Sequence, residues 1–141
     1  MTRRLFLRSL WTLPLLTLPE TALPSEKPAS LSYLLNRFAV AGFQYHQGPE
    51  LIHALRPGQP LALTAEPDNH HDRFAVRIDY EASKLGYVPR SDNRHISRLL
   101  RQDARLWCRV REVDEDVGPW RAVVVEVGMG EGAAGQPSFT N

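Results

Sequence analysis

The sequence predicts a mainly β fold in which six short strands close into a small barrel that carries two short α-helices. Six apolar or alternating runs of strand length are separated by turn residues such as Gly42, Pro57-Gly58 and Pro89. Two further segments space their apolar residues as helices do. Short antiparallel strands usually close into a barrel, since open edges would leave backbone groups unpaired. With 141 residues, 43% of them hydrophobic, the chain has the size of one globular domain.

The expected strands are short and end at glycine, proline or polar clusters. The third is the most regular, because strict alternation would place Phe74, Val76, Ile78 and Tyr80 on one face. The turn before the last strand is expected at residues 116–119, which include Gly118 and Pro119. The six expected strands are residues 38–43, 61–65, 74–80, 83–88, 106–110 and 120–127.

Two helices are expected between these strands. The first covers residues 49–56 (PELIHALR), with Pro49 at a position that favours helix initiation and Pro57-Gly58 as its end. The second covers residues 91–102 (SDNRHISRLLRQ), where Ser91 or Asp92 is the expected N-cap. Its apolar stripe consists of Ile96, Leu99 and Leu100.

A row of arginines follows the second helix opposite its apolar stripe. If the helix runs far enough, a periodicity of 100° per residue gathers Arg94, Arg98, Arg101 and Arg105 on one side. Such a row is either an ordinary solvated face or a surface for phosphates. Residues 30–141 carry 13 basic and 14 acidic side chains, so the domain is not broadly basic, and its net charge favours the solvated face over a surface for phosphates.

The first 29 residues have the layout of a signal peptide and linker. A charged start precedes an apolar stretch from Leu10 to Leu18, which is shorter than the roughly 20 residues that a membrane-spanning helix needs. Residues 2–8 (TRRLFLR) resemble the twin-arginine export signature. The alternative is an amphipathic arm packed on the domain. If the signal operates, we expect a periplasmic or secreted protein, and otherwise a cytoplasmic one.

The rest of the chain is expected to consist of two parts. These are a domain at residues 30–128 and a disordered tail at residues 129–141.

Metal binding and catalysis find little support in the residue pattern. His70 and His71 are sequence neighbours, so in an extended segment they point to opposite sides and cannot easily form a ligand pair. A site that combines His71, Asp72 and His46 stays conceivable. The chain shows no nucleophile elbow and no glycine-rich phosphate loop. We therefore expect a protein that is not an enzyme and that needs no metal or cofactor.

Three motifs, in this order, resemble the HIRAN domain family: residues 40–48 (VAGFQYHQG), 66–76 (EPDNHHDRFAV) and 85–90 (LGYVPR). The resemblance covers roughly residues 38–127 and implies an OB-like barrel with two helices. It also implies that the domain captures the free 3′ end of single-stranded DNA, as HIRAN domains of eukaryotic helicase-like proteins do. In bacteria the domain also occurs as small stand-alone proteins.

The resemblance assigns roles to individual positions. Tyr45 and His46 match a base-stacking pair in which His46 replaces an aromatic residue, and Gln44 stands where DNA-binding members have an arginine. Asp72 matches the carboxylate that accepts a hydrogen bond from the 3′ hydroxyl. Asn69 and His71 match the loop around the terminal nucleotide, and Tyr87 and Arg90 match the far wall. Together with Arg94, these residues are the expected DNA-binding set.

Two alternatives stay open at this stage. Asn69 and Asp72 could simply cap their own turn before a strand, as Asx side chains commonly do. The protein could also be an exported envelope component that binds a ligand or another protein and no nucleic acid. In either case we expect no stable insertion into a membrane.

The export signal is testable in cells. Replacement of Arg3→Lys together with Arg4→Lys should retain the protein in the cytoplasm, because twin-arginine signals are recognised through the paired guanidinium groups. Cell fractionation measures the distribution. An unchanged distribution of the double variant would remove the twin-arginine interpretation.

Overall fold

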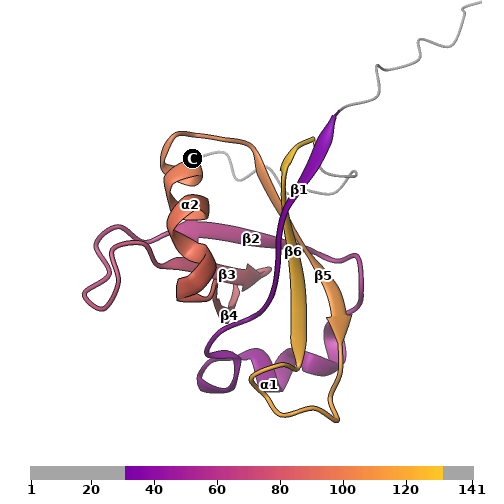
Figure 1. Ribbon diagram of the computed structural model, residues 1–141. Helices are drawn as coiled ribbons and strands as arrows, with labels where there is room; N and C mark the ends of the chain where they lie inside the picture. Colours follow the sequence, from indigo (N-terminus) through magenta and orange to yellow (C-terminus); the bar gives the residue numbers. More distant parts are fainter. Residues whose placement is uncertain (1–30, 132–141) are drawn as a thin grey trace, which may run out of the picture.

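Six antiparallel strands form one sheet in the computed structural model, which describes residues 31–131 (Figure 1). Their order across the sheet is β1-β6-β5-β2-β3-β4. The mainly β class with two α-helices is therefore confirmed, whereas the expected signal segment lies outside the described residues. The strands are β1 (Ser32–Ala39), β2 (Pro60–Ala65), β3 (Val76–Tyr80), β4 (Ser83–Tyr87), β5 (Leu106–Val113) and β6 (Val123–Gly130).

Two features turn the sheet into a partly closed barrel. Strand β2 pairs with β5 through Pro60 and Leu61 and with β3 through its remaining residues, so it joins two crossing halves. Beyond the end of β1, Ala41 exchanges two backbone hydrogen bonds with Tyr87 of β4, at 2.8 and 2.9 Å. This bridge connects the two outer strands of the sheet, and it closes the barrel at one end.

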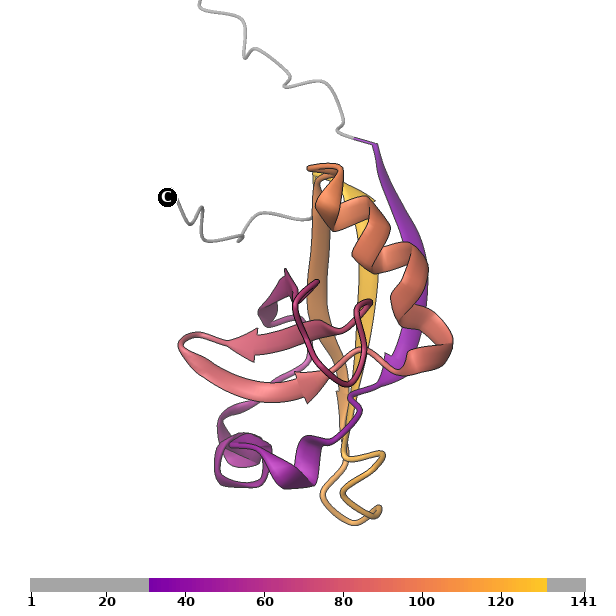
Figure 2. The same ribbon diagram turned by 90° about the vertical axis from the view of Figure 1, so that its left-hand side faces the viewer.

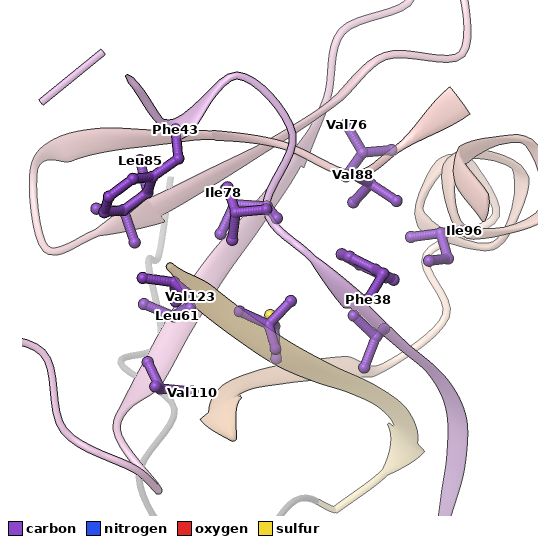
Figure 3. Packing of buried hydrophobic residues seen from close by; sticks show 14 of the residues in the cluster. Phe38, Phe43, Leu61, Val76, Ile78, Leu85, Val88, Ile96, Val110 and Val123 are labelled. Atoms are coloured by element: carbon purple, nitrogen blue, oxygen red, sulfur yellow. The ribbon is translucent and has the colours of Figure 1, made fainter. Parts of the chain in front are cut away.

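The core fills the space inside this curved sheet. Val76, Ile78 and Leu85 are fully buried, and so are Val125 and Val127 of β6. Figure 3 shows Ile96 on the same side of the cluster as Phe38, Val76 and Val88, so α2 covers this end of the barrel. Burial of each such side chain contributes roughly 1.5–3 kcal/mol, which makes the alternating strands the main source of stability.

The helical segments lie at the two ends of the barrel. Phe43–Tyr45 form the 3-10 turn η1, Gly48–Leu51 form α1, and Ile52–Ala54 form the 3-10 turn η2. The expected helix at residues 49–56 is thus one α-helical turn followed by a 3-10 turn. The longer helix, α2, covers Arg90–Arg101. No helix within residues 31–131 is long and apolar enough to cross a membrane.

The first strand lies earlier in the chain than the sequence predicts. It covers Ser32–Ala39 instead of residues 38–43, because Gly42 adopts a left-handed conformation with φ of 70° and starts η1. Phe43 is buried under this turn, not in a strand, and its ring lies directly against Gly48. An apolar run that packs on the core through a 3-10 turn has the same composition as a buried strand, so the sequence pattern could not separate them.

Four smaller predictions are also corrected. Neither Ser91 nor Asp92 caps α2, whose N-cap is Pro89 without a side-chain hydrogen bond. The helix ends at Arg101, so Arg105 is not part of its arginine row. Strands β3 and β6 begin at Val76 and Val123, two and three residues later than expected. Strand β6 continues to Gly130, beyond the expected domain boundary at residue 128.

Closure of the barrel depends on a glycine at position 86. A Cβ atom there would lie 2.4 Å from the carbonyl oxygen of Ala41, which is bound in the closing bridge, and φ is 157°. We expect Gly86→Ala to lower the free energy of unfolding by about 3 kcal/mol, because backbone atoms cannot move aside as a side chain can. Urea denaturation measures the change.

Gly58→Ala is the matched control for this substitution. Gly58 also has a positive φ, of 89°, but nothing lies within 4 Å of the added Cβ. It should cost only about 1 kcal/mol, from backbone strain alone. Equal losses of unfolding free energy in the two variants would show that the close contact between position 86 and the Ala41 carbonyl oxygen contributes nothing.

Candidate nucleic-acid interface

A pocket of about 390 Å³ opens beside the closing bridge, where four segments meet. They are the turn after β1, the β2–β3 loop, β4 and the first turn of α2. In Figure 2 the β2–β3 loop lies between the β3–β4 hairpin and α2. The lining residues are Ala41, Gly42, His46, Asn69, His71, Asp72, Ala75, Lys84, Tyr87, Val88, Arg90 and Asn93.

The β2–β3 loop is built from two successive turns. Backbone N–H groups of Asn69 and Ala75 donate to the carbonyls of Glu66 and Asp72, at 3.1 and 3.0 Å. Between the turns, the Asn69 side-chain oxygen accepts from the backbone N–H groups of His71 and Asp72, at 2.9 and 3.2 Å. The Asx capping expected as an alternative is therefore present at Asn69. It holds the loop in a form in which both Asn69 and Asp72 line the pocket.

A chain of side-chain hydrogen bonds ties this loop to β4. Lys84 Nζ donates to the Tyr87 hydroxyl at 2.6 Å, and this hydroxyl donates to Glu66 Oε2 at 3.0 Å. Asn69 Nδ2 donates to the same oxygen at 3.0 Å. Burial alone would raise the pKa of Glu66, but these hydrogen bonds and the charges of Lys84 and Arg77 lower it overall. Glu66 is therefore ionised and orients both the loop and one wall of the pocket.

Asp72 receives three contacts at the opposite wall. Its Oδ1 accepts from the Phe74 backbone N–H at 2.8 Å, and its Oδ2 accepts from Asn93 Nδ2 at 2.7 Å. Arg90 Nε lies 3.8 Å from Oδ2. The Phe74 hydrogen bond is the main cause that lowers the pKa of Asp72, and the carboxyl is ionised at neutral pH. Because each carboxylate oxygen can accept two hydrogen bonds, Asp72 keeps acceptor capacity for a ligand.

The expected base-stacking pair is divided between the pocket and the surface. His46 lines the pocket, and its ring meets that of Tyr87 edge to face with centroids 5.8 Å apart. Burial, followed by the charge of Lys84, lowers the pKa of His46, so the ring is neutral at pH 7. Tyr45 is 79% exposed and does not line the pocket. A ring this exposed has no part in the core.

The structure brings together six of the nine expected site residues, from three separate motifs. Those that line the pocket are His46, Asn69, His71, Asp72, Tyr87 and Arg90. Gln44 does not line it, and its side-chain oxygen is buried without a hydrogen-bond partner in residues 31–131. Arg94 lies outside as well, with its guanidinium 5.0 Å from the centre of the Phe74 ring.

Two important polar residues of the pocket are not in the expected set. Lys84 lies two residues before the Gly-Tyr motif, and Asn93 lies in the first turns of α2. Only their polarity and their proximity to a motif could have indicated them, since the contacts that they make depend on the fold. Asn93 is 4% exposed and holds Asp72, so it is a structural part of the wall.

The histidines do not converge on a metal site in the described part of the chain. No group of three or more His, Cys, Asp or Glu side chains suited to a metal occurs within residues 31–131. His71 lines the pocket and His70 does not. The conceivable set of His46, His71 and Asp72 therefore shares the pocket without forming a coordination cluster.

The fold is a partly closed barrel with a pocket at its rim that carries polar and charged side chains. The family model described as the HIRAN domain matches residues 34–126, more than half of the chain. The protein belongs to the HIRAN domain family. No curated protein gives a significant match.

Two solved structures share the fold. A protein from Lactobacillus plantarum superposes with a TM-score of 0.63 at 24% identity, over 73% of this chain and 99% of its own. The HIRAN domain of human HLTF superposes with a TM-score of 0.51 at 18% identity, over 70% of this chain and 77% of its own. At these identities the likeness concerns the fold alone.

The two ionised carboxyls of the site predict a dependence of stability on acid. Because the folded-state pKa values of Glu66 and Asp72 are lowered, their contribution is complete above the unfolded pKa of about 4 and is lost as pH falls through the folded values. Thermal unfolding between pH 7 and pH 2.5 measures this loss. Glu66→Gln and Asp72→Asn should each reduce the loss of stability at low pH. The same loss in both variants as in the unaltered protein would contradict the stabilising role of the two carboxylates.

Proposed function

We propose that this HIRAN domain binds the free 3′ end of single-stranded DNA in the pocket beside the closing bridge. One observation carries the proposal: an ionised carboxylate with free acceptor capacity, Asp72, lies in a pocket whose walls also carry the cations Lys84 and Arg90. A terminal nucleotide complements this combination, since its 3′ hydroxyl can donate a hydrogen bond to the carboxylate and its 5′ phosphate is an anion that the cations attract.

The charges explain why an end would be preferred to an internal position. A phosphate on the 3′ oxygen would approach the Asp72 carboxylate and be repelled, whereas a hydroxyl donates to it. Arg90 is held at the rim by a hydrogen bond of 3.2 Å to the His71 carbonyl, and its side chain is 76% exposed. Its remaining donors are available for the phosphate on the 5′ side of the terminal nucleotide.

Aromatic side chains supply the remaining part of the interface. His46 and Tyr87 line the pocket, and the neutral imidazole presents a stacking surface at pH 7. Tyr45 follows on the exposed surface. Stacking of a base on an exposed ring contributes about 1–3 kcal/mol and tolerates every base. Recognition would therefore depend on the end of the strand, not on its sequence.

Fluorescence anisotropy with a single-stranded oligonucleotide tests the proposal. The full-length protein should bind the free 3′ hydroxyl form about tenfold more tightly than the 3′-phosphorylated form, a difference of about 1.4 kcal/mol. Asp72→Asn should bring this ratio close to one, because it removes the repelling charge and retains a side-chain oxygen to accept from Phe74.

Asp68→Asn is the matched control. Asp68 belongs to the same loop and is exposed, but it does not line the pocket. This variant should keep the preference of the unaltered protein for the free end. Equal affinity of the unaltered protein for both oligonucleotides, or no binding at low salt, would sink the proposed function and favour a ligand other than nucleic acid.

A further inference from the structure

Three arginines from two segments surround one aromatic ring next to the pocket. The guanidinium carbons of Arg73, Arg94 and Arg98 lie 4.9, 5.0 and 5.7 Å from the centre of the Phe74 ring. Arg73 precedes Phe74 in the β2–β3 loop, and the other two come from α2. We call these four residues the arginine patch.

The arginine patch continues directly from the pocket wall. Arg90 lines the pocket, and Arg94 and Arg98 follow it on α2 at intervals of four residues, which places the three on one face about 6 Å apart along the axis. Figure 2 shows α2 extending from the level of the β2–β3 loop toward one end of the molecule. The charge of Arg94 acts on Asp72, so the arginine patch and the pocket share one electrostatic environment.

The guanidinium groups of the arginine patch are not paired directly with a carboxylate in the described part of the chain. Among residues 31–131, none of the three forms an ion pair, and their side chains donate no hydrogen bond. Cation–π contacts with Phe74 hold them in place at about 0.5–1 kcal/mol each. Their N–H donors therefore remain available, and a bound anion would relieve the repulsion between three neighbouring positive charges.

Two other basic surfaces differ in this respect. Arg37, Arg109 and Arg111 converge on one buried carboxylate, that of Glu126, at 2.6, 3.1 and 3.6 Å. A second pocket, of about 420 Å³ on the other side of Lys84, balances Lys84 and Arg77 with Asp79 and Glu81. A solvated helix face also carries arginines, but it does not gather a third one from a loop around a shared ring.

We infer that the arginine patch binds backbone phosphates of the DNA strand whose 3′ end occupies the pocket, so that the strand leaves the pocket along α2. The inference rests on the proposed function and adds the direction of the strand and the residues that follow it. The affinity for a long strand then has two separable parts: end recognition at Asp72 and phosphate contacts at Arg94 and Arg98.

Oligonucleotide length separates these two parts. Arg94→Gln together with Arg98→Gln should lower the affinity of the full-length protein for a decanucleotide roughly tenfold more than its affinity for a dinucleotide. The slope of log affinity against log salt should decrease by about 1.4, because each single-strand phosphate contact contributes about 0.7. The preference for a free 3′ hydroxyl should remain. Anisotropy titrations at several salt concentrations give all three quantities, and circular dichroism checks the fold.

Arg105→Gln together with Arg121→Gln is the matched control, because both residues are exposed and lie outside the arginine patch. This pair should change neither affinity by more than twofold. A decanucleotide affinity and salt slope in the Arg94 and Arg98 double variant equal to those of the unaltered protein would overturn the inference, even if the free end is still preferred. If the unaltered protein binds neither oligonucleotide, the proposed function fails and the inference fails with it. A lowered decanucleotide affinity without any preference for the free end would support the arginine patch alone.

Discussion

Tyr87 is the residue on which both the fold and the pocket depend. Its backbone exchanges two hydrogen bonds with Ala41, which closes the barrel, while its hydroxyl donates to Glu66 and accepts from Lys84. The same residue therefore joins the ends of the sheet and fixes the loop that carries Asn69, His71 and Asp72. Gly86 has to precede it, because only a residue without a Cβ allows the Ala41 carbonyl to approach so closely. Barrel closure and the shape of the pocket consequently depend on the same residue.

The opposed charges of the pocket follow from this arrangement. Glu66 is occupied by Tyr87 and Asn69, so its charge is used to hold the structure. Asp72 is held from one side by the backbone of Phe74 and from the other by Asn93, which leaves lone pairs directed to the pocket. Glu66 and Asp72 lie six residues apart and each accepts two hydrogen bonds, but only Asp72 lines the pocket, so the two carboxylates have different tasks. An ionised group that is rigid and only partly satisfied is well suited to recognise a hydroxyl.

Local sequence patterns predicted the number of strands and the turns of the β2–β3 loop, but they misplaced β1 and predicted the directions of side chains poorly. The alternation of β3 and the capping roles of Asn69 belong to short segments, where each residue acts on its neighbours. Asn93 was missed because its partner lies 21 residues away and only the packing of α2 brings the two together. Phe74 was expected on a strand face, but the chain turns there, and the ring meets arginines from α2 instead of the core. Such contacts depend on angles between elements, which a single sequence does not encode in its periodicity.

A domain without excess positive charge can still bind an anionic strand if its cations are distributed unevenly. Residues 30–141 carry nearly equal numbers of basic and acidic side chains, yet none of the three arginines around Phe74 forms an ion pair in the described structure, whereas those around Glu126 share one carboxylate. A broadly basic surface would hold any stretch of nucleic acid and would compete with recognition of an end. In the proposed binding mode, a short row of arginines that begins at a hydroxyl acceptor would add most affinity to strands whose terminus already occupies the pocket. A low net charge thus favours selectivity, since the affinity of the domain for strands that place no terminus in the pocket stays small.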